Sequence, residues 1–286
     1  MIQSSELILN PDGSVYHLNL LPEHIAHDII FVGDQTRVEK ITQFFDSIEF
    51  STQKREFKTQ TGIYKGKRIS VISTGIGPDN IDIVLNELDA LVNIDLQTRL
   101  PKENLISLNI VRIGTSGALQ ADIPVDSFVI SKIGLGLDNM LRSYCIDEIT
   151  NCDLENEFVS QTNWDVKKGH PYAVPCSAKL LNIFETTETI SGITATSGGF
   201  YGPQGRILRL PLQDADLNKK MDSFEFEGAK ITNLEMETAA IYGLSALLGH
   251  QAISLSAIVA NRANGLFSEN PDRTIEKLIQ FVLQKI

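Results

Sequence analysis

The sequence predicts a single-domain α/β fold of three layers, in which helices cover both faces of a central, mixed but mostly parallel twisted sheet. Three strand–loop units follow one another in the first half of the chain, and the first two lead into amphipathic helices. Repetition of this unit is typical of a mainly parallel sheet with helices on both faces. No Pro/Ser-rich linker or run of like charge divides the 286 residues, so we expect one domain over residues 1–286.

The composition is that of an ordinary soluble globular protein, with 42% hydrophobic and 21% charged residues. A net charge of −11 argues against a nucleic-acid partner but not against an anionic substrate, because a few arginines in a cleft set the local potential. No signal peptide and no long apolar run are present, so we expect no membrane contact. Three cysteines without metal-ligand spacing favour a reduced, cytoplasmic setting and no metal site.

The first unit is a predicted strand over 28–32 that ends in Gly33 and Asp34. Apolar residues at helical spacing predict a helix over 36–45, and its amino terminus would favour an anion within reach of Arg37. A lone Gly-Asp is more often only a turn. The second unit is a strand over 68–73, a loop over 74–78 and a helix over 80–93 whose start Pro78 suits.

The third unit carries the most informative residues. A buried strand is predicted from the apolar run that ends at Ile113, and Arg112 lies near its carboxyl end. Thr115 and Ser116 follow between Gly114 and Gly117, whose backbone can approach a ligand closely. A guanidinium beside hydroxyls at a strand end suits an oxyanion, phosphate above all. The alternative is an arginine satisfied by carbonyls or a carboxylate, with glycines that only turn the chain.

The middle of the chain is less readable. A strand is predicted over 127–132, and residues 134–190 are interpreted as a variable substrate-side insertion with a helix over 178–184. After a strand over 192–196, residues 197–206 form a glycine-rich loop that contains aromatic, amide and guanidinium side chains. These groups could stack on and hydrogen-bond a planar heterocycle, or they could belong to a plain surface loop.

The stretch from Thr232 opens the clearest predicted helix, which ends before Gly249. Thr232 and Glu235 have the spacing of a capping box, so Glu235 is interpreted as structural. Glu237 is less well explained, its structural alternative being favourable placement near the helix amino terminus. A buried strand over 252–260 and a last helix over 273–283 complete the predicted fold.

From Tyr16 to Arg262 the chain resembles the nucleoside phosphorylase-I superfamily, and within it most closely the uridine phosphorylases. Each motif alone is unspecific, but their order is highly specific. The motifs are Tyr16-His17-Leu18, Gly33-Asp34-Gln35-Thr36-Arg37, Arg55-Glu56-Phe57, Arg112-Ile113-Gly114-Thr115-Ser116-Gly117, Phe200-Tyr201 with Gln204-Gly205-Arg206, Asn233 with Glu235-Met236-Glu237, and Asn261-Arg262.

The resemblance implies a phosphate site, a ribose site and a base site. Phosphate would be bound by Gly33, Arg37, Arg112 and Thr115, with Arg55 reaching in from a neighbouring subunit. Ribose would be held by Thr115, Met236 and Glu237, with His17 of the neighbour at the 5′ hydroxyl. The base would contact Ser116, Phe200, Gln204 and Arg206. The active site would therefore be shared in a homo-oligomer, either a dimer or a hexamer.

The implied reaction is phosphorolysis of uridine or deoxyuridine, with phosphate as co-substrate and no cofactor. Displacement of a base from C1′ passes through an oxocarbenium-like sugar and needs no covalent nucleophile. The protein must position phosphate and stabilise the leaving base, so Arg112, Arg206 and Glu237 are the expected catalytic residues. The alternatives are a phosphorylase for purine nucleosides or thymidine, a nucleosidase that uses water, and a non-catalytic nucleoside-binding protein.

The expected base is a pyrimidine. Purine-specific relatives carry an Asp acid near the end of the late strand, and this chain has Asn261 there. An amide cannot deliver the proton that a leaving purine takes up at N7. A uracil anion spreads its charge onto two carbonyl oxygens, which Gln204 and Arg206 suit. The alternative is that these two side chains only brace the loop.

Overall fold

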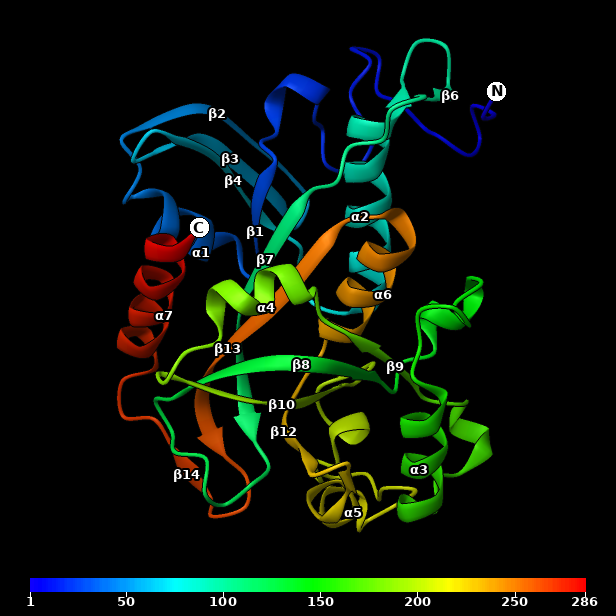
Figure 1. Cartoon of the computed structure of the whole chain (residues 1–286), viewed down its shortest axis with the longest axis vertical. Coiled ribbons are helices and arrows are strands. Elements are labelled where there is room, and N and C mark those ends of the chain that lie inside the picture. The colour runs from blue at the N-terminus through cyan, green and yellow to red at the C-terminus, as the bar shows by residue number, and fades with distance from the viewer. The chain divides into compact units, whose positions relative to one another are not determined.

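The computed structural model describes residues 1–286, which fold into two compact units (Figure 1). The first unit contains Met1–Val111 and Leu248–Gln251, and the second contains Arg112–Leu247 and Ala252–Ile286. The chain passes between them within strand β7 (Asn109–Ala118). A single domain over 1–286, with an insertion over 134–190, remains a prediction.

The first unit is built on four strands in the order β1-β4-β3-β2. Strand β1 (Asp28–Val32) pairs with β4 (Lys67–Ser73) in parallel, whereas β4 with β3 (Phe57–Tyr64) and β3 with β2 (Ser47–Lys54) are antiparallel. Helix α1 (Gln35–Thr42) packs on β3 and β4. The unit also contains η1 (Pro22–His24), α2 (Pro78–Asn93), β5 (Ile94–Asp95) and β6 (Leu100–Pro101).

The second unit places its strands in the order β11-β12-β10-β8-β13-β7. Strand β7 also pairs with β12 through Asn233↔Ala118 and Leu234↔Gly117, so that five of these strands close into a ring. Parallel pairs join β10 to β8 and to β12, and β13 runs antiparallel to β8. The bounds are β8 (Phe128–Gly136), β10 (Thr189–Thr196), β11 (Glu225–Phe226), β12 (Ala229–Glu235) and β13 (Gln251–Asn261).

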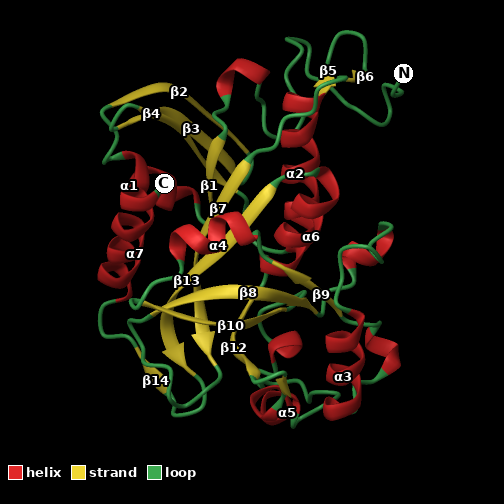
Figure 2. Ribbon diagram, in the orientation of Figure 1, coloured by secondary structure: helices red, strands yellow, loops and turns green.

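Helices α3 (Cys152–Thr162) and α5 (Leu217–Ser223) of the second unit contact each other, and Figure 2 shows them side by side. Their core contains Phe158, whose ring lies 5.4 Å from that of Trp164 and 5.3 Å from that of Phe224. The remaining elements are η2 (Met140–Ser143), η3 (Val166–Lys168), β9 (Tyr172–Pro175), α4 (Ala178–Phe184), η4 (Gly202–Gln204), α6 (Thr238–Leu248), β14 (Leu266–Phe267) and α7 (Pro271–Lys285).

The predicted mixed α/β fold with a central mixed sheet is confirmed, but the sheet is not mostly parallel, because the hairpins and return strands add more antiparallel pairs than the parallel pairs β1–β4, β10–β8 and β10–β12. The strand over 28–32 and the helix over 178–184 have the predicted bounds. Two local predictions are wrong. Residues 114–117 continue strand β7 instead of forming a loop, and residues 232–235 belong to strand β12 instead of opening the helix. Gly117 and Ala118 pair with Leu234 and Asn233, which supplies backbone partners that no local pattern reveals.

Candidate active site

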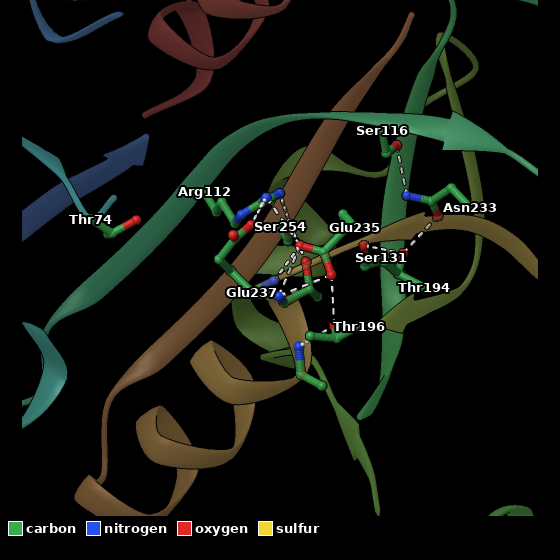
Figure 3. Close-up of polar contacts among 12 residues, drawn as sticks. Thr74, Arg112, Ser116, Ser131, Thr194, Thr196, Asn233, Glu235, Glu237 and Ser254 are labelled. Carbon is green, nitrogen blue, oxygen red and sulfur yellow. Dashed lines mark hydrogen bonds and ion pairs between the residues drawn. The ribbon is translucent and has the colours of Figure 1, made fainter. Parts of the chain in front are cut away.

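A buried ion-pair cluster centres on Arg112 (Figure 3). Its Nη2 atom lies 2.5 Å from Oε2 of Glu237 and 3.0 Å from Oε2 of Glu235. Its Nη1 atom donates to Oγ of Ser254 at 3.3 Å. All three charged side chains are at least nine-tenths buried, with exposures of 8%, 7% and 2%. The predicted phosphate ligand and the predicted ribose ligand are therefore brought into direct contact.

The charges in this cluster do not cancel. Burial opposes the charge of Arg112, but the carboxylates of Glu235 and Glu237 outweigh it and raise the pKa of the guanidinium above its ordinary value. Two carboxylates beside one guanidinium leave excess negative charge at a buried place. The Glu237 carboxylate can accept hydrogen bonds from sugar hydroxyls, whereas a phosphate anion would need cations in addition to Arg112.

Gly114 makes the position of Arg112 possible. A Cβ atom at Gly114 would lie 2.0 Å from Nη1 and 2.6 Å from Cζ of Arg112. The guanidinium therefore folds back over its own strand. It occupies the space that a side chain at position 114 would fill, so only glycine is tolerated there. The prediction that Gly114 follows the strand is wrong, because this glycine lies within β7 and accommodates the arginine side chain. Close approach of a ligand to its backbone stays a prediction.

Glu235 joins strand β12 to helix α6. Its carboxylate accepts from the backbone N–H groups of Glu237 at 2.9 Å and of Thr238 at 3.0 Å. It also accepts from the hydroxyl of Thr196 at 2.6 Å. The expected capping box with Thr232 is wrong, since the Thr232 hydroxyl lies in β12 and donates to the Ile193 carbonyl. The structural role predicted for Glu235 is confirmed through these other contacts, and it holds Glu237 in place.

A chain of buried polar groups reaches the predicted base ligand Ser116 (Figure 3). The amide of Asn233, which is fully buried, donates to Oγ of Ser116 at 2.9 Å. Its Oδ1 atom accepts from the hydroxyls of Thr194 and Thr232, both at 2.8 Å. The amide orientation that this pattern favours leaves the Ser116 proton available to a ligand. Thr115, beside it on β7, is half-buried.

The loop after β10 holds the other predicted base ligands together. Arg206 donates from Nη1 to the Phe200 carbonyl at 2.6 Å and to Oε1 of Gln204 at 2.5 Å. Its guanidinium also lies 3.8 Å from the centre of the Phe200 ring. Gln204 is buried, whereas half of Phe200 is exposed. The contacts expected if Gln204 and Arg206 brace the loop are thus present. The NH2 group of Gln204 is left to donate to a ligand.

Arg262 was given no role in the sequence analysis, but the structure places it in this neighbourhood. Its Nη1 atom is buried without a hydrogen-bond partner. Burial and the positive charge of Arg206 lower the pKa of Arg262 to about 10. Its side chain lies against Gly117, where an added Cβ would be 3.4 Å away. Two neighbouring guanidiniums, one with an unused donor, favour an electron-rich group such as a carbonyl oxygen. Only its position directly after the strand-end Asn261 hinted at such a role.

Gly33 and Arg37 lie at the start of α1 in the first unit. The helix is capped by Asp34, whose carboxylate accepts from the Thr36 N–H at 2.9 Å and from the Thr36 hydroxyl at 2.6 Å. Arg37 is in the first turn and is half-buried. The predicted strand, glycine turn and helix start are therefore confirmed as local structure, and their use as an anion site stays a prediction.

His17 and Arg55, the two residues expected to reach a neighbouring subunit, lie on segments that contact each other. Lys54 donates to the carbonyl oxygen of Tyr16, and its ammonium lies 4.3 Å from the centre of the Tyr16 ring. Arg55 occupies the tip of the β2–β3 hairpin, is exposed, and has a left-handed φ of 56°. Such a conformation is costly for a residue with a Cβ, by roughly 1–2 kcal/mol.

No group of three or more His, Cys, Asp or Glu side chains is arranged to bind a metal ion. None of the helices combines the length and the apolar character that crossing a membrane requires. The cysteines are all unpaired.

Residues 28–285 match the family model of the phosphorylase superfamily. The chain belongs to the phosphorylase superfamily. The match covers most of both compact units, and it contains every predicted site residue except His17. The resemblance derived from the sequence motifs is confirmed.

Superfamily members with curated names are similar over nearly the whole chain. A uridine phosphorylase of Thermococcus kodakarensis is 29% identical, over 93% of this chain and 84% of its own length. A uridine phosphorylase of Haemophilus influenzae is 27% identical, over 87% of each chain. A DeoD-type purine nucleoside phosphorylase of Brevibacillus brevis is 26% identical, over 93% of this chain and 96% of its own.

Among solved superfamily structures, a Trypanosoma brucei nucleoside phosphorylase described as showing uridine phosphorylase activity matches with a TM-score of 0.87. It is 29% identical and covers 98% of each chain. A uridine phosphorylase of the oomycete Phytophthora capsici matches with a TM-score of 0.70 at 23% identity, a likeness of fold.

Proposed function

We propose that this chain is a uridine phosphorylase, which cleaves uridine or deoxyuridine reversibly with phosphate to give uracil and ribose or deoxyribose 1-phosphate. The observation that carries the proposal is the buried contact of Arg112 with Glu237 and Glu235. It sets a guanidinium beside the Glu237 carboxylate, which can accept hydrogen bonds from sugar hydroxyls. The names of the similar relatives from Thermococcus kodakarensis and Haemophilus influenzae support the same activity.

Phosphate is held by the Gly33 N–H, Arg37, Arg112 and Thr115 of one subunit. Arg55 of a neighbouring subunit completes this site. A single guanidinium flanked by two carboxylates is too weak an anion site, so the additional arginines supply the missing positive charge. Phosphate then attacks C1′ of the ribose directly, and no cofactor takes part.

Ribose is held by Glu237 through its 2′ and 3′ hydroxyls, with Met236 and Thr115 beside it and His17 of the neighbouring subunit at the 5′ hydroxyl. As the glycosidic bond breaks, positive charge develops on the sugar, which the nearby carboxylate and phosphate stabilise. Negative charge develops on the base, where Gln204, Arg206 and Ser116 receive it and Phe200 packs on the ring. Arg262, with its unused Nη1 donor, adds a second cation on that side.

The proposed assembly is a homo-oligomer with shared active sites. It is supported by the exposure of Arg55 at the tip of its hairpin and by the contact of Lys54 with Tyr16. That contact holds the segments that carry His17 and Arg55 together. One subunit interface can therefore place both residues in the neighbouring active site. We place this oligomer in the cytoplasm.

Purine phosphorolysis is the second candidate, because DeoD-type purine nucleoside phosphorylases are also similar to the chain. Asn261 argues against it. Its amide donates to the carbonyls of Gln120 at 2.9 Å and Ile123 at 2.7 Å, and its Oδ1 accepts from the Ala263 N–H at 2.9 Å. The Asn261 amide is thus fully hydrogen-bonded to the backbone, and an amide cannot act as the acid that protonates N7 of a purine.

Release of ribose 1-phosphate from uridine, measured with and without inorganic phosphate, tests the proposal. A phosphorylase forms the sugar phosphate only when phosphate is present. Release of free ribose and uracil in phosphate-free buffer at an unchanged rate would identify a nucleosidase instead. Binding of uridine without any turnover in saturating phosphate would identify a non-catalytic nucleoside-binding protein.

A further inference from the structure

The carboxylate of Glu87, on helix α2, accepts hydrogen bonds from the segment that carries His17. One carboxylate oxygen accepts from the His17 backbone N–H at 2.9 Å, and the other accepts from the Leu18 N–H at 2.8 Å. The His17 imidazole lies at the same carboxylate, with Nδ1 2.6 Å from Oε1. The Glu87 side chain is 13% exposed, so these contacts are made in a largely desolvated place.

These contacts decide which ring nitrogen of His17 can meet a ligand. A carboxylate only accepts hydrogen bonds, so Nδ1 must carry the proton whether the ring is neutral or charged. Nε2 lies on the other side of the ring and makes no hydrogen bond within the chain. The ring is further held by Tyr16 and Phe57, with centroids 4.9 Å and 6.4 Å from its own.

The backbone around His17 is fixed independently of the ring. Val15, Leu18 and Leu20 are fully buried, and the Val15 N–H donates to the Leu20 carbonyl at 3.0 Å. Asn19 closes this turn with a left-handed φ of 55°. The segment would thus remain folded if the contact between Glu87 and the imidazole were lost. Because folding does not require this contact, its role is to orient the His17 ring.

We propose that Glu87 is a positioning residue for the 5′ hydroxyl of the nucleoside, because it fixes the tautomer and direction of His17 and presents Nε2 to the neighbouring subunit's active site. This inference rests on the proposed function, in which His17 contacts the 5′ hydroxyl. It adds a specificity-determining residue that touches no substrate itself.

The test compares uridine with 5′-deoxyuridine, which lacks only the hydroxyl in question, in the intact oligomer. Glu87→Gln keeps the size of the side chain but gives up the negative charge that fixes the ring. We expect kcat/KM for uridine to fall roughly three- to tenfold, mainly through KM, as for loss of one hydrogen bond. The value for 5′-deoxyuridine should stay unchanged. His17→Ala should show the same selective loss, and the double variant should be no worse than His17→Ala.

Asp89→Asn is the matched control. Asp89 lies on the same helix, and its carboxylate faces His250 at 3.4 Å and the Asn93 amide at 2.6 Å. It should leave the ratio of the two substrates unchanged. If Glu87→Gln does not fold, Glu87→Asp, which keeps the charge but withdraws it from the ring, is measured in the same way and should show the same selective loss.

The possible failures are distinguishable. An equal loss for both substrates in the Glu87 variants, or no loss, would overturn the positioning role while leaving the phosphorylase proposal intact. If His17→Ala treats uridine and 5′-deoxyuridine alike, the proposed ribose contact itself is wrong, and the role of Glu87 falls with it. Absence of phosphorolysis in the unmodified protein would instead overturn the proposed function.

Discussion

The guanidinium of Arg112 and the carboxylate of Glu237 lie 2.5 Å apart in the buried centre of the second unit. One was expected to bind phosphate and the other to bind ribose, so the two substrates would meet at a pair that is already formed. Removal of one partner of a buried ion pair leaves an uncompensated charge, which costs about 3–5 kcal/mol of stability. Variants of this pair must therefore be measured for folding as well as for activity.

Gly114→Ala should abolish most activity because it displaces Arg112. The new Cβ would lie 2.0 Å from Nη1 of Arg112, so the guanidinium must move out of its contacts with Glu235 and Glu237, and the thermal midpoint should fall with the activity. We expect kcat/KM for uridine to fall about tenfold or more, which is ~1.4 kcal/mol or more in the barrier. Steady-state kinetics and the thermal midpoint, measured together, check this.

Arg112→Ala is the reference for that variant. Loss of one charged stabiliser should raise the barrier by roughly 2–4 kcal/mol. Because Glu235 and Glu237 then lose their partner completely, the thermal midpoint should fall further than that of Gly114→Ala, which keeps the guanidinium but displaces it. Full activity and phosphate affinity in Arg112→Ala would show that this arginine is not the phosphate ligand.

Mixed oligomers test whether the sites are shared. Arg55→Ala and Arg112→Ala subunits should each be inactive alone, because each lacks one half of every site. After exchange of subunits, some interfaces combine an intact Arg55 with an intact Arg112, and activity should partly return. Activity is measured after unfolding and refolding the two variants together, with mass spectrometry to verify exchange. Verified mixed oligomers without recovered activity would mean that each chain contains a complete site.

Local patterns predicted several strands and helices well, and the reason is visible in particular elements. Strand 28–32 is an apolar run that is buried almost throughout, helix 178–184 buries Leu180 and Phe184 one turn apart, and Pro78 begins α2 as its fixed φ suggests. The hairpin of β2 and β3 was missed because β2 alternates exposed and half-buried residues without a strong apolar face. The place of Gly114 inside strand β7 could not be predicted, because the contact that requires a glycine comes from the Arg112 side chain folded back along the same strand.

Some residues of the candidate site could also be predicted from local sequence, and others could not. Arg112 could be singled out because a charge in an apolar strand is unusual, and Glu235 because a helix start needs a cap. Arg262 could not, since its isolation from carboxylates and its closeness to Arg206 depend on how distant loops meet. Glu87 offered no signal either, because its partners are 69 and 70 residues away along the chain.

Asp138 should give the protein a measurable pH dependence of stability. Burial raises the pKa of its carboxyl above the ordinary 3.8, although the Tyr172 hydroxyl donates to it at 2.8 Å and opposes this shift. Between the ordinary and the raised pKa the folded state binds more protons than the unfolded state. The contribution of Asp138 to the unfolding free energy therefore falls as the pH rises through that window.

Asp138→Asn removes this titration while retaining an oxygen that can accept from Tyr172. The stability of the variant relative to the unmodified protein should increase as the pH rises above the ordinary carboxyl pKa of 3.8. Urea unfolding at several pH values measures that difference, in which the contributions of all other carboxyls cancel. A difference that stays constant with pH would show that the Asp138 carboxyl titrates normally.

The choice of base decides between the two candidate functions. Uridine should be cleaved with a kcat/KM orders of magnitude above that for inosine at saturating phosphate, because Asn261 cannot protonate a purine and a uracil anion can be held by Gln204 and Arg206. Gln204→Ala should remove most of this advantage. The exposed Gln213, whose amide donates to Asp165 at 2.8 Å outside the proposed site, supplies the control variant Gln213→Ala, which should retain this advantage.

If Gln204 only braces Arg206, its loss should lower thermal stability and slow the cleavage of both nucleosides alike. Preference for inosine in the unmodified protein would reject the pyrimidine assignment but keep the phosphorylase proposal.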